Sequence, residues 1–330
     1  SDDFRETGSG VDLQVQRITE LMPTVTSQHL HVRTPSGDLL TRSVHEAGLT
    51  AKYGLTSNLT LDLTVNPDFS QVETDVPQIQ VNQRFPLFFT ELRPFFLEGQ
   101  EAFRTNGPSP FLHTRTIIDP QVGARLTGKV GRWLIGAVAA NDASSGKVDS
   151  PTDPAFGRKA TVGALRLRYD IYRESYSGVL LVDREFLDGH SRLAMFDNNF
   201  RLGRNRTLGV AGVVTDHRDA AGVVRKGHFV DVGFVGQGRS LGYIAAYHLT
   251  SPDYRNDSGF VQRVDYRRAF CNASYRWWPE GTVVNWGPRV SYERNYDYAG
   301  TLMDEVRGLT WNTLLTRNVT LSASANRNME

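Results

Sequence analysis

The sequence of 330 residues lacks several features that would place it quickly in a class of proteins. It has a single cysteine, Cys271, which excludes an internal disulfide framework. Its 37 basic and 36 acidic residues nearly balance, so the overall charge does not favour a polyanionic partner. We therefore expect no nucleic acid among its partners.

Long apolar runs are also missing. The longest clearly apolar stretch lies near residues 134–140, far short of the ~20 residues that a membrane-spanning helix needs. Helical periodicity is almost absent from the whole sequence. These absences exclude helical membrane proteins. They leave a transmembrane β-barrel open, because the strands of a barrel alternate in polarity and their hydropathy averages out.

What the sequence does have is alternation of apolar and polar residues with a period of two. In residues 59–65, leucine or valine occupies every second position, and threonine or aspartate fills the positions between. This pattern indicates β-strands with one apolar and one polar face. Other segments that follow it are 46–55, 122–130, 165–171, 230–234 and 309–315.

The connections between these strands alternate between short and long. Residues 131–132 and 173–175 are short, whereas 141–158 and 185–190 are long and polar. Short turns at one rim and long loops at the other are typical of outer-membrane barrels. We therefore predict an all-β fold, a transmembrane antiparallel up-and-down β-barrel of about 14 to 16 strands forming the single domain 1–330. Because closed single-chain barrels have even strand numbers, we also expect at least one strand beyond Glu330.

The polar faces of the strands carry many charged side chains. A soluble sandwich core could not bury so many of them without partners, whereas a water-filled or plugged lumen could. The charges predicted to face the lumen are Glu46, Lys52, Arg125, Lys129, Arg166, Arg168, Arg201 and Arg289.

Residues 66–104 interrupt the alternation between the predicted third and fourth strands. Their four prolines exclude a central strand, and their phenylalanines are too numerous to remain in water. We expect this segment to fold inward as a plug or constriction loop, with its acids paired to arginines of the lumen. The residues predicted to form it are Asp68, Phe69, Glu73, Asp75, Arg84, Phe88, Phe89, Arg93, Phe95, Phe96 and Glu98.

The same stretch resembles a known family. "GLTSNLTLDLTVNPDFSQVETD", followed by "RFPLFFTELRPFFLEG", is similar to a bacterial outer-membrane β-barrel domain of unknown function. In that family the barrel usually lies C-terminal to a family-9-like carbohydrate-binding sandwich domain. The resemblance is strongest over residues 47–104. It implies an outer-membrane location and a carbohydrate-binding-like domain upstream, and it implies no particular reaction.

These observations favour a channel, or a solute- or glycan-uptake component, with a loop-restricted lumen. The expected partners are outer-membrane lipid and a small solute or glycan, and no cofactor is required. Two alternatives stay open: a non-conducting anchor or assembly barrel, and a barrel-anchored glycan hydrolase. For the hydrolase, Asp68, Glu73 and Asp75 would supply the carboxylates. The same acids could instead hold calcium, although their spacing is not that of an EF-hand and salt bridges are the preferred role.

Overall fold

The computed structural model describes residues 19–33, 39–67, 88–148, 150–279 and 281–329. Among them are 15 strands in a single sheet and a few short helical turns. The strands are β1 (Thr19–Arg33), β2 (Leu39–Thr56), β3 (Leu59–Val65), β4 (Val122–Val130), β5 (Trp133–Asp142), β6 (Ala160–Tyr172), β7 (Ser175–Phe186), β8 (Gly189–Leu202), β9 (Arg206–Arg218), β10 (Val224–Gln237), β11 (Leu241–Thr250), β12 (Tyr266–Tyr275), β13 (Val283–Tyr296), β14 (Leu302–Leu315) and β15 (Thr320–Met329). The helical turns are α1 (Pro94–Leu97), η1 (Gln100–Phe103), η2 (Thr114–Thr116), η3 (Ala143–Gly146) and η4 (Thr316–Asn318).

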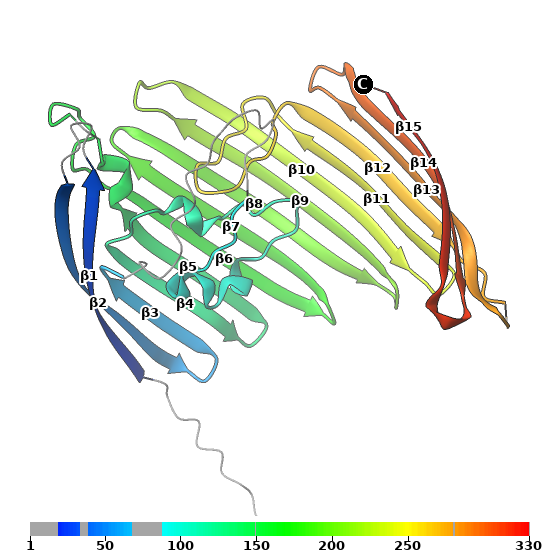
Figure 1. Ribbon diagram of the computed structural model, residues 1–330, viewed down its shortest axis with the longest axis horizontal. Coiled ribbons are helices and arrows are strands. Elements are labelled where there is room, and N and C mark those ends of the chain that lie inside the picture. Colours follow the sequence, from blue (N-terminus) through cyan, green and yellow to red (C-terminus); the bar gives the residue numbers. More distant parts are fainter. Residues whose placement is uncertain (1–18, 34–38, 68–87, 149, 280, 330) are drawn as a thin grey trace, which may run out of the picture.

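Every strand pairs antiparallel with its neighbours in the sequence, from β1 to β15 (Figure 1). The predicted all-β, up-and-down architecture and its strand number are therefore confirmed. Closure is not observed within the described residues, because β1 pairs with β2 and β15 pairs with β14, which leaves two edge strands. No helix in the described part of the chain is long and apolar enough to cross a membrane.

The connections at the two ends of the sheet differ in length, as the sequence indicates. At one end, β4 and β5 are joined by two residues, and Gly131 adopts a positive φ of 59° in that turn. At the other end lie the longest connections, residues 66–121 and 251–265. The prediction of a long loop at 185–190 is wrong. Strand β7 ends only at Phe186 and β8 begins at Gly189, so the two strands form a tight hairpin.

The register assigns each residue to one of two faces, since cross-strand partners point to the same side of a sheet. We call the face that carries Asp62, Arg125 and Arg166 the inner face, and the opposite one the outer face. Leucine and valine dominate the outer face and remain exposed: Val214 is 60% and Leu309 53% accessible. No second sheet covers them in the described chain.

Aromatic side chains gather on the outer face close to the short turns. Trp277 stacks on Trp286 with ring centroids 4.5 Å apart, and Trp311 lies 5.2 Å from Trp286. On the other half of the sheet, Trp133 packs against Tyr169 at 4.9 Å. Rings with an apolar body and a polar edge prefer the boundary between hydrocarbon and water. The outer face therefore has an aromatic band at the short-turn end and an aliphatic belt above it.

Candidate functional site

The inner face of β3 to β10 is covered by the end of the connection between β3 and β4. We call its described part, residues 88–121, the inserted segment; it contains α1, η1 and η2. Figure 1 shows this segment (cyan) in front of the green strands. The connection runs from 66 to 121 and is thus longer than the predicted 66–104.

A hydrophobic cluster attaches the inserted segment to the sheet. Its rings Phe95, Phe96 and Phe111, together with Ile117, are at least 94% buried. They pack with inner-face side chains of the central strands, and Phe111 lies 5.2 Å from Phe229 in an edge-to-face contact. Burying a side chain of this size contributes about 1.5–3 kcal/mol, so the cluster is the main force that holds the segment. Its sheet members include Val162, Leu180, Val182, Leu193, Met195 and Val213.

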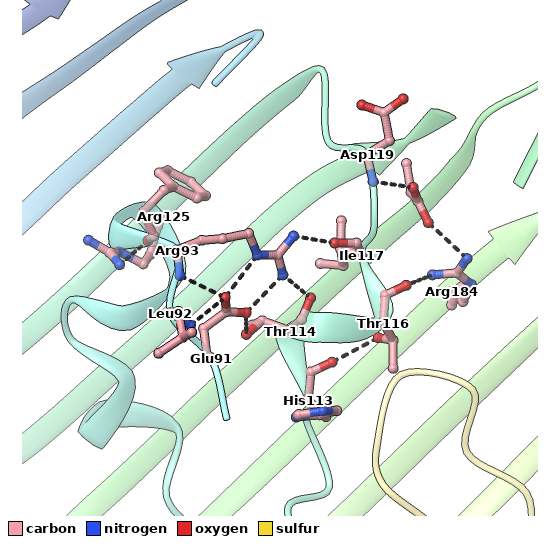
Figure 2. Close-up of polar contacts among 12 residues, drawn as sticks. Glu91, Leu92, Arg93, His113, Thr114, Thr116, Ile117, Asp119, Arg125 and Arg184 are labelled. Atoms are coloured by element: carbon pink, nitrogen blue, oxygen red, sulfur yellow. Dashed lines mark hydrogen bonds and ion pairs between the residues drawn. The ribbon is translucent and has the colours of Figure 1, made fainter. Parts of the chain in front are cut away.

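The chain path before α1 is fixed by a buried ion pair between Glu91 and Arg93 (Figure 2). Arg93 donates from Nε and Nη2 to the two carboxylate oxygens of Glu91, each at 2.8 Å. It also donates to the carbonyl oxygens of Ile117 (2.5 Å) and Thr114 (2.7 Å), while the Thr114 hydroxyl donates to Glu91. Both charges are fully hydrogen-bonded, so the pair links the start of the inserted segment to its η2 turn.

The surroundings of this pair set the protonation of two groups. Burial alone would raise the pKa of Glu91, but hydrogen bonds from Arg93 and Thr114 outweigh it and hold that pKa below its usual 4.5. Burial lowers the pKa of His113 below its usual 6.5, because the neighbouring arginines offset the attraction of Glu91. At neutral pH, Glu91 is therefore charged and His113 is neutral.

Charged residues of the inner face bind the backbone of the inserted segment directly. Arg125 pairs with Asp62 at 2.8 Å and donates from Nη1 to the carbonyl oxygens of Phe95 and Glu98. Lys52 donates to the Glu98 carboxylate at 2.5 Å. Gly123 makes this approach possible, since a Cβ there would lie 3.0 Å from the Phe95 ring.

A second buried pair anchors the middle of the segment. Arg166 and Asp197 are fully buried and form a two-pronged ion pair, with Nη2 of Arg166 3.0 Å from Oδ2 of Asp197. The backbone N–H of Asn106 donates to Asp197 at 3.0 Å, and its side chain donates to the carbonyl oxygen of Asn198. Gly178 provides the space for Arg166, because a Cβ there would lie 2.5 Å from the guanidinium.

A second insertion, residues 251–265 between β11 and β12, packs against the first. The backbone N–H of His113 donates to Ser258 (2.7 Å), that of Phe260 donates to Pro110 (3.0 Å), and the Asn256 side chain donates to Phe111 (2.7 Å). Tyr254 belongs to the hydrophobic cluster. Figure 1 shows both insertions on the same side of the sheet. Both insertions also contact the sheet, since Phe111 and Tyr254 each pack against Phe229 of β10.

The residues predicted for the plug lie in different places. Asp68, Phe69, Glu73, Asp75 and Arg84 lie outside the described residues, so the calcium and hydrolase hypotheses based on these acids stay untested. The described residues hold no group of three metal-ligating side chains.

The other six predicted plug residues are described. Phe95, Phe96 and Arg93 are buried. Phe88 is half exposed beside His113 and Phe260, with ring centroids 4.9 and 5.2 Å away. The last two contact cations: Glu98 binds Lys52, and Phe89 lies 6.0 Å from the Arg115 guanidinium.

The charges predicted to face the lumen all lie on the inner face in this register. Lys129 and Arg168 both pair with Asp170, at 2.6 and 3.3 Å, and Arg201 pairs with Glu174 at 3.1 Å. Arg289 lines a polar depression of about 500 Å³ at the short-turn end. The remaining members are Glu46, Lys52, Arg125 and Arg166. Their role in a lumen stays a prediction, since the sheet is not closed.

Several residues that build this site were not singled out from the sequence. Asn106 completes the anchor formed by Arg166 and Asp197, although it lies 91 residues before Asp197 in the sequence. In the sequence, the second insertion has the composition of an ordinary polar connection. Its sequence, "SPDYRNDSGFVQRVD", does carry a signal, because Tyr254 and Phe260 are unusual in a solvated connection.

Comparison with known proteins gives three findings. The family model for a domain of unknown function (DUF5916) matches residues 19–116, which include the stretch that carries the family resemblance. No curated protein matches the sequence. Among solved structures, the chain is similar to OccK1 (OpdK) of Pseudomonas aeruginosa, with 13% identity, a TM-score of 0.37, and coverage of 94% of this chain and 83% of that one.

Two further structures show the same level of similarity. OccK8 (OprE) of Pseudomonas aeruginosa has 9% identity and a TM-score of 0.41, with 94% of this chain and 84% of that chain covered. OccAB1 of Acinetobacter baumannii has 11% identity and a TM-score of 0.37, with 95% and 91% covered.

Proposed function

We propose that this chain is an outer-membrane β-barrel that passes a small polar solute through a lumen narrowed by the inserted segment. The observation that carries the proposal is the contrast between the two faces of one continuous sheet. The outer face is aliphatic and exposed, whereas the inner face carries charges and is partly covered by the two insertions. Lipid tails are the partner that suits an exposed aliphatic belt bounded by aromatic rings.

The backbone supports the same location. A strand can cross hydrocarbon only if its N–H and C=O groups are paired, because each unpaired group costs several kcal/mol there. From β2 to β14 every strand has a partner on both sides. Only the two edge strands need a further partner, and closure of the barrel would supply it.

The proposed mechanism needs no covalent chemistry. The inserted segment reduces the free cross-section, and the inner-face charges that it leaves accessible set the selectivity. Lys129, Arg201 and Arg289 are candidates for this role, since none of them is fixed to the inserted segment. The solute would be small and polar, and a glycan fragment fits the carbohydrate-binding-like domain that we expect upstream.

A hydrolase at the barrel mouth is the alternative that the sequence leaves open, and no contact among the described residues favours it. Glu91 and Glu98, two carboxylates of the inserted segment, are bound by Arg93 and by Lys52. They act as structural anchors. Replacing Asp68, Glu73 and Asp75 with alanine tests the hydrolase directly, because loss of glycan turnover with unchanged conductance would support it.

Planar-bilayer conductance tests the proposed function. The full chain should give small discrete current steps, and a variant lacking residues 71–104 should give clearly larger ones. A variant shortened within the exposed residues 151–154 is the matched control and should conduct like the wild type. Inserted protein that gives no current in any variant would contradict the channel and favour an anchor barrel.

A further inference from the structure

An unusual group of cations lies on the outer face of β12 to β15, at the end with the long connections. On the outer face of β13, Arg294 lies two residues after Tyr292 and four after Val290. On β14, Arg307 lies two residues before Leu309. Arg327 lies directly opposite Arg307 across the β14–β15 ladder. Arg267 belongs to the same face of β12, opposite Tyr296. The arginines therefore begin where the aliphatic belt ends.

The acids in this group are too few to neutralise it. Glu305 is the only acidic residue at outer-face positions of the described parts of these four strands, and it is 98% buried. It pairs with Arg294 at 2.5 Å and also with Arg307. Four arginines against one glutamate leave three positive charges. Arg327 has no acidic side chain within ion-pair distance among the described residues.

The pair formed by Arg307 and Arg327 is the feature of this group that most favours binding of an anion. Like charges directly opposite on antiparallel strands repel each other, because their Cβ atoms lie only about 4.5–5.5 Å apart. In water such a pair is screened. At the edge of a bilayer the repulsion is stronger, so an anion between the two guanidinium groups would stabilise this register.

The guanidinium groups are also held in position. Arg294 and Arg307 lie 5.5 and 5.8 Å from the ring of Tyr292, on which both can stack. Each uses Nε to bind Glu305, which leaves the Nη atoms of Arg307 directed away from that carboxylate. The side chain of Arg307 is 53% exposed. A planar fork of N–H donors presented in this way fits a phosphate group.

We propose that these arginines bind the phosphate group of an anionic lipid in the leaflet at the long-connection end. The inference rests on the proposed location in a membrane, since only then is the outer face covered by lipid. Phosphorylated headgroups lie at the boundary of the hydrocarbon, which is the level at which the aliphatic belt gives way to the arginines. The bound lipid would also cover β15, an edge strand of the described sheet.

Charge balance distinguishes this group from the other outer-face charges at the same end. Arg192 on β8 pairs with Asp183 at 3.1 Å and with Glu185 at 2.8 Å. There the acids outnumber the arginine, so no anion is required. Arg192 thus provides a matched control of the same residue type, on the same face and at the same end of the sheet.

Retention of a phosphorylated lipid by the detergent-solubilised full chain tests the proposal. The probe is diphosphoryl lipid A, with phosphatidylcholine as the lipid without net charge, and bound lipid is counted by native mass spectrometry. The wild type should retain lipid A in preference to phosphatidylcholine. Arg307→Gln and Arg327→Gln should each weaken retention by about tenfold, since each removes a charge-assisted contact. Arg192→Gln should leave it unchanged.

The contradicting outcomes are distinct. Equal retention by the wild type and Arg327→Gln, a variant that disturbs no described ion pair, would overturn the proposal. So would equal loss in Arg192→Gln, or complete displacement of the lipid by inorganic phosphate, which would indicate a site for the free ion.

Insertion into phosphatidylcholine liposomes is measured in parallel. Failure of the wild type to insert contradicts the proposed function, whereas lipid retention in detergent still reports on the arginines.

Discussion

At the scale of single residues, the Glu91–Arg93 pair makes the attachment of the inserted segment sensitive to the loss of either partner. A buried ion pair adds little net stability, but removing one partner leaves an uncompensated charge. Arg93→Met should therefore destabilise the attached state of the segment by about 3–5 kcal/mol. Hydrogen exchange of the amides in residues 88–121 should become faster.

The control for this substitution is Glu101→Gln in η1. Glu101 is exposed and forms no described ion pair, so its exchange pattern should match that of the wild type. Unchanged protection in Arg93→Met would show that the pair does not hold the segment.

Two titratable groups, Glu91 of this pair and the nearby His113, make the attachment of the inserted segment sensitive to acid. The pKa values of Glu91 and His113 are both lowered in the attached state. Their contributions to stability are therefore fully present above the ordinary values and are lost as the pH falls from the ordinary values through the lowered ones. His113, ordinarily near 6.5, should act first and Glu91, ordinarily near 4.5, second.

Conductance followed from about pH 7 to about pH 4 should therefore rise, as the segment is released. A His113→Gln variant should lack the upper part of this rise. Conductance that falls or stays level with acid would contradict the assignment.

At the scale of elements, the phenylalanines of α1 carry most of the attachment. Phe96 is 97% buried, whereas Phe88 at the start of the segment is 49% exposed. Phe96→Ala should cost about 3–5 kcal/mol and should open the segment to protease within residues 88–121. Phe88→Ala is the matched control and should change cleavage little. Similar protease resistance in both variants would mean that the cluster does not determine the position of α1.

The sequence predicts these elements unevenly. Period-two alternation identifies the strands, and the prolines and phenylalanines mark the segment that leaves the sheet. The surface that receives this segment is harder to predict, because the central strands carry apolar residues on both faces. In β7, Val179 and Leu181 point outward while Leu180 and Val182 point inward, so the run "GVLLV" loses its alternation. A run of this kind indicates burial on both sides, and here the inner partner is the inserted segment.

The long-range pairs of the site could not be predicted from sequence at all. Arg125 and Arg166 can be assigned to the polar face from their phase within a strand. Their partners Asp62 and Asp197 depend on the register between strands and on the path of the insertion. That path is set by the summed packing of many side chains, and no local pattern contains it.

At the scale of the whole molecule, the proposed location in a membrane requires that the outer face contacts lipid. A charged side chain in the middle of a lipid-facing belt costs about 2–4 kcal/mol. Val214→Arg, on the outer face of β9, should lower the free energy of unfolding by that amount, as measured by urea titration of the protein in liposomes. Val223→Arg, in the connection between β9 and β10, should have no such effect, because it lies outside the strands. Equal effects of the two substitutions would contradict the assignment of the belt.

The single cysteine allows the most direct test of this orientation. Cys271 lies on the outer face of β12, in phase with Ala269 and Ala273, and it is exposed. A nitroxide attached to it in liposomes reports on its surroundings through collisions with oxygen, which concentrates in lipid, and with a water-soluble nickel complex. A label at Asn272→Cys, in a background with Cys271→Ala, reports on the inner face.

If the outer face contacts lipid, the label at Cys271 should collide mainly with oxygen and the label at position 272 mainly with nickel. Preferential collision with nickel at Cys271, in protein that has inserted into the liposomes, would contradict it.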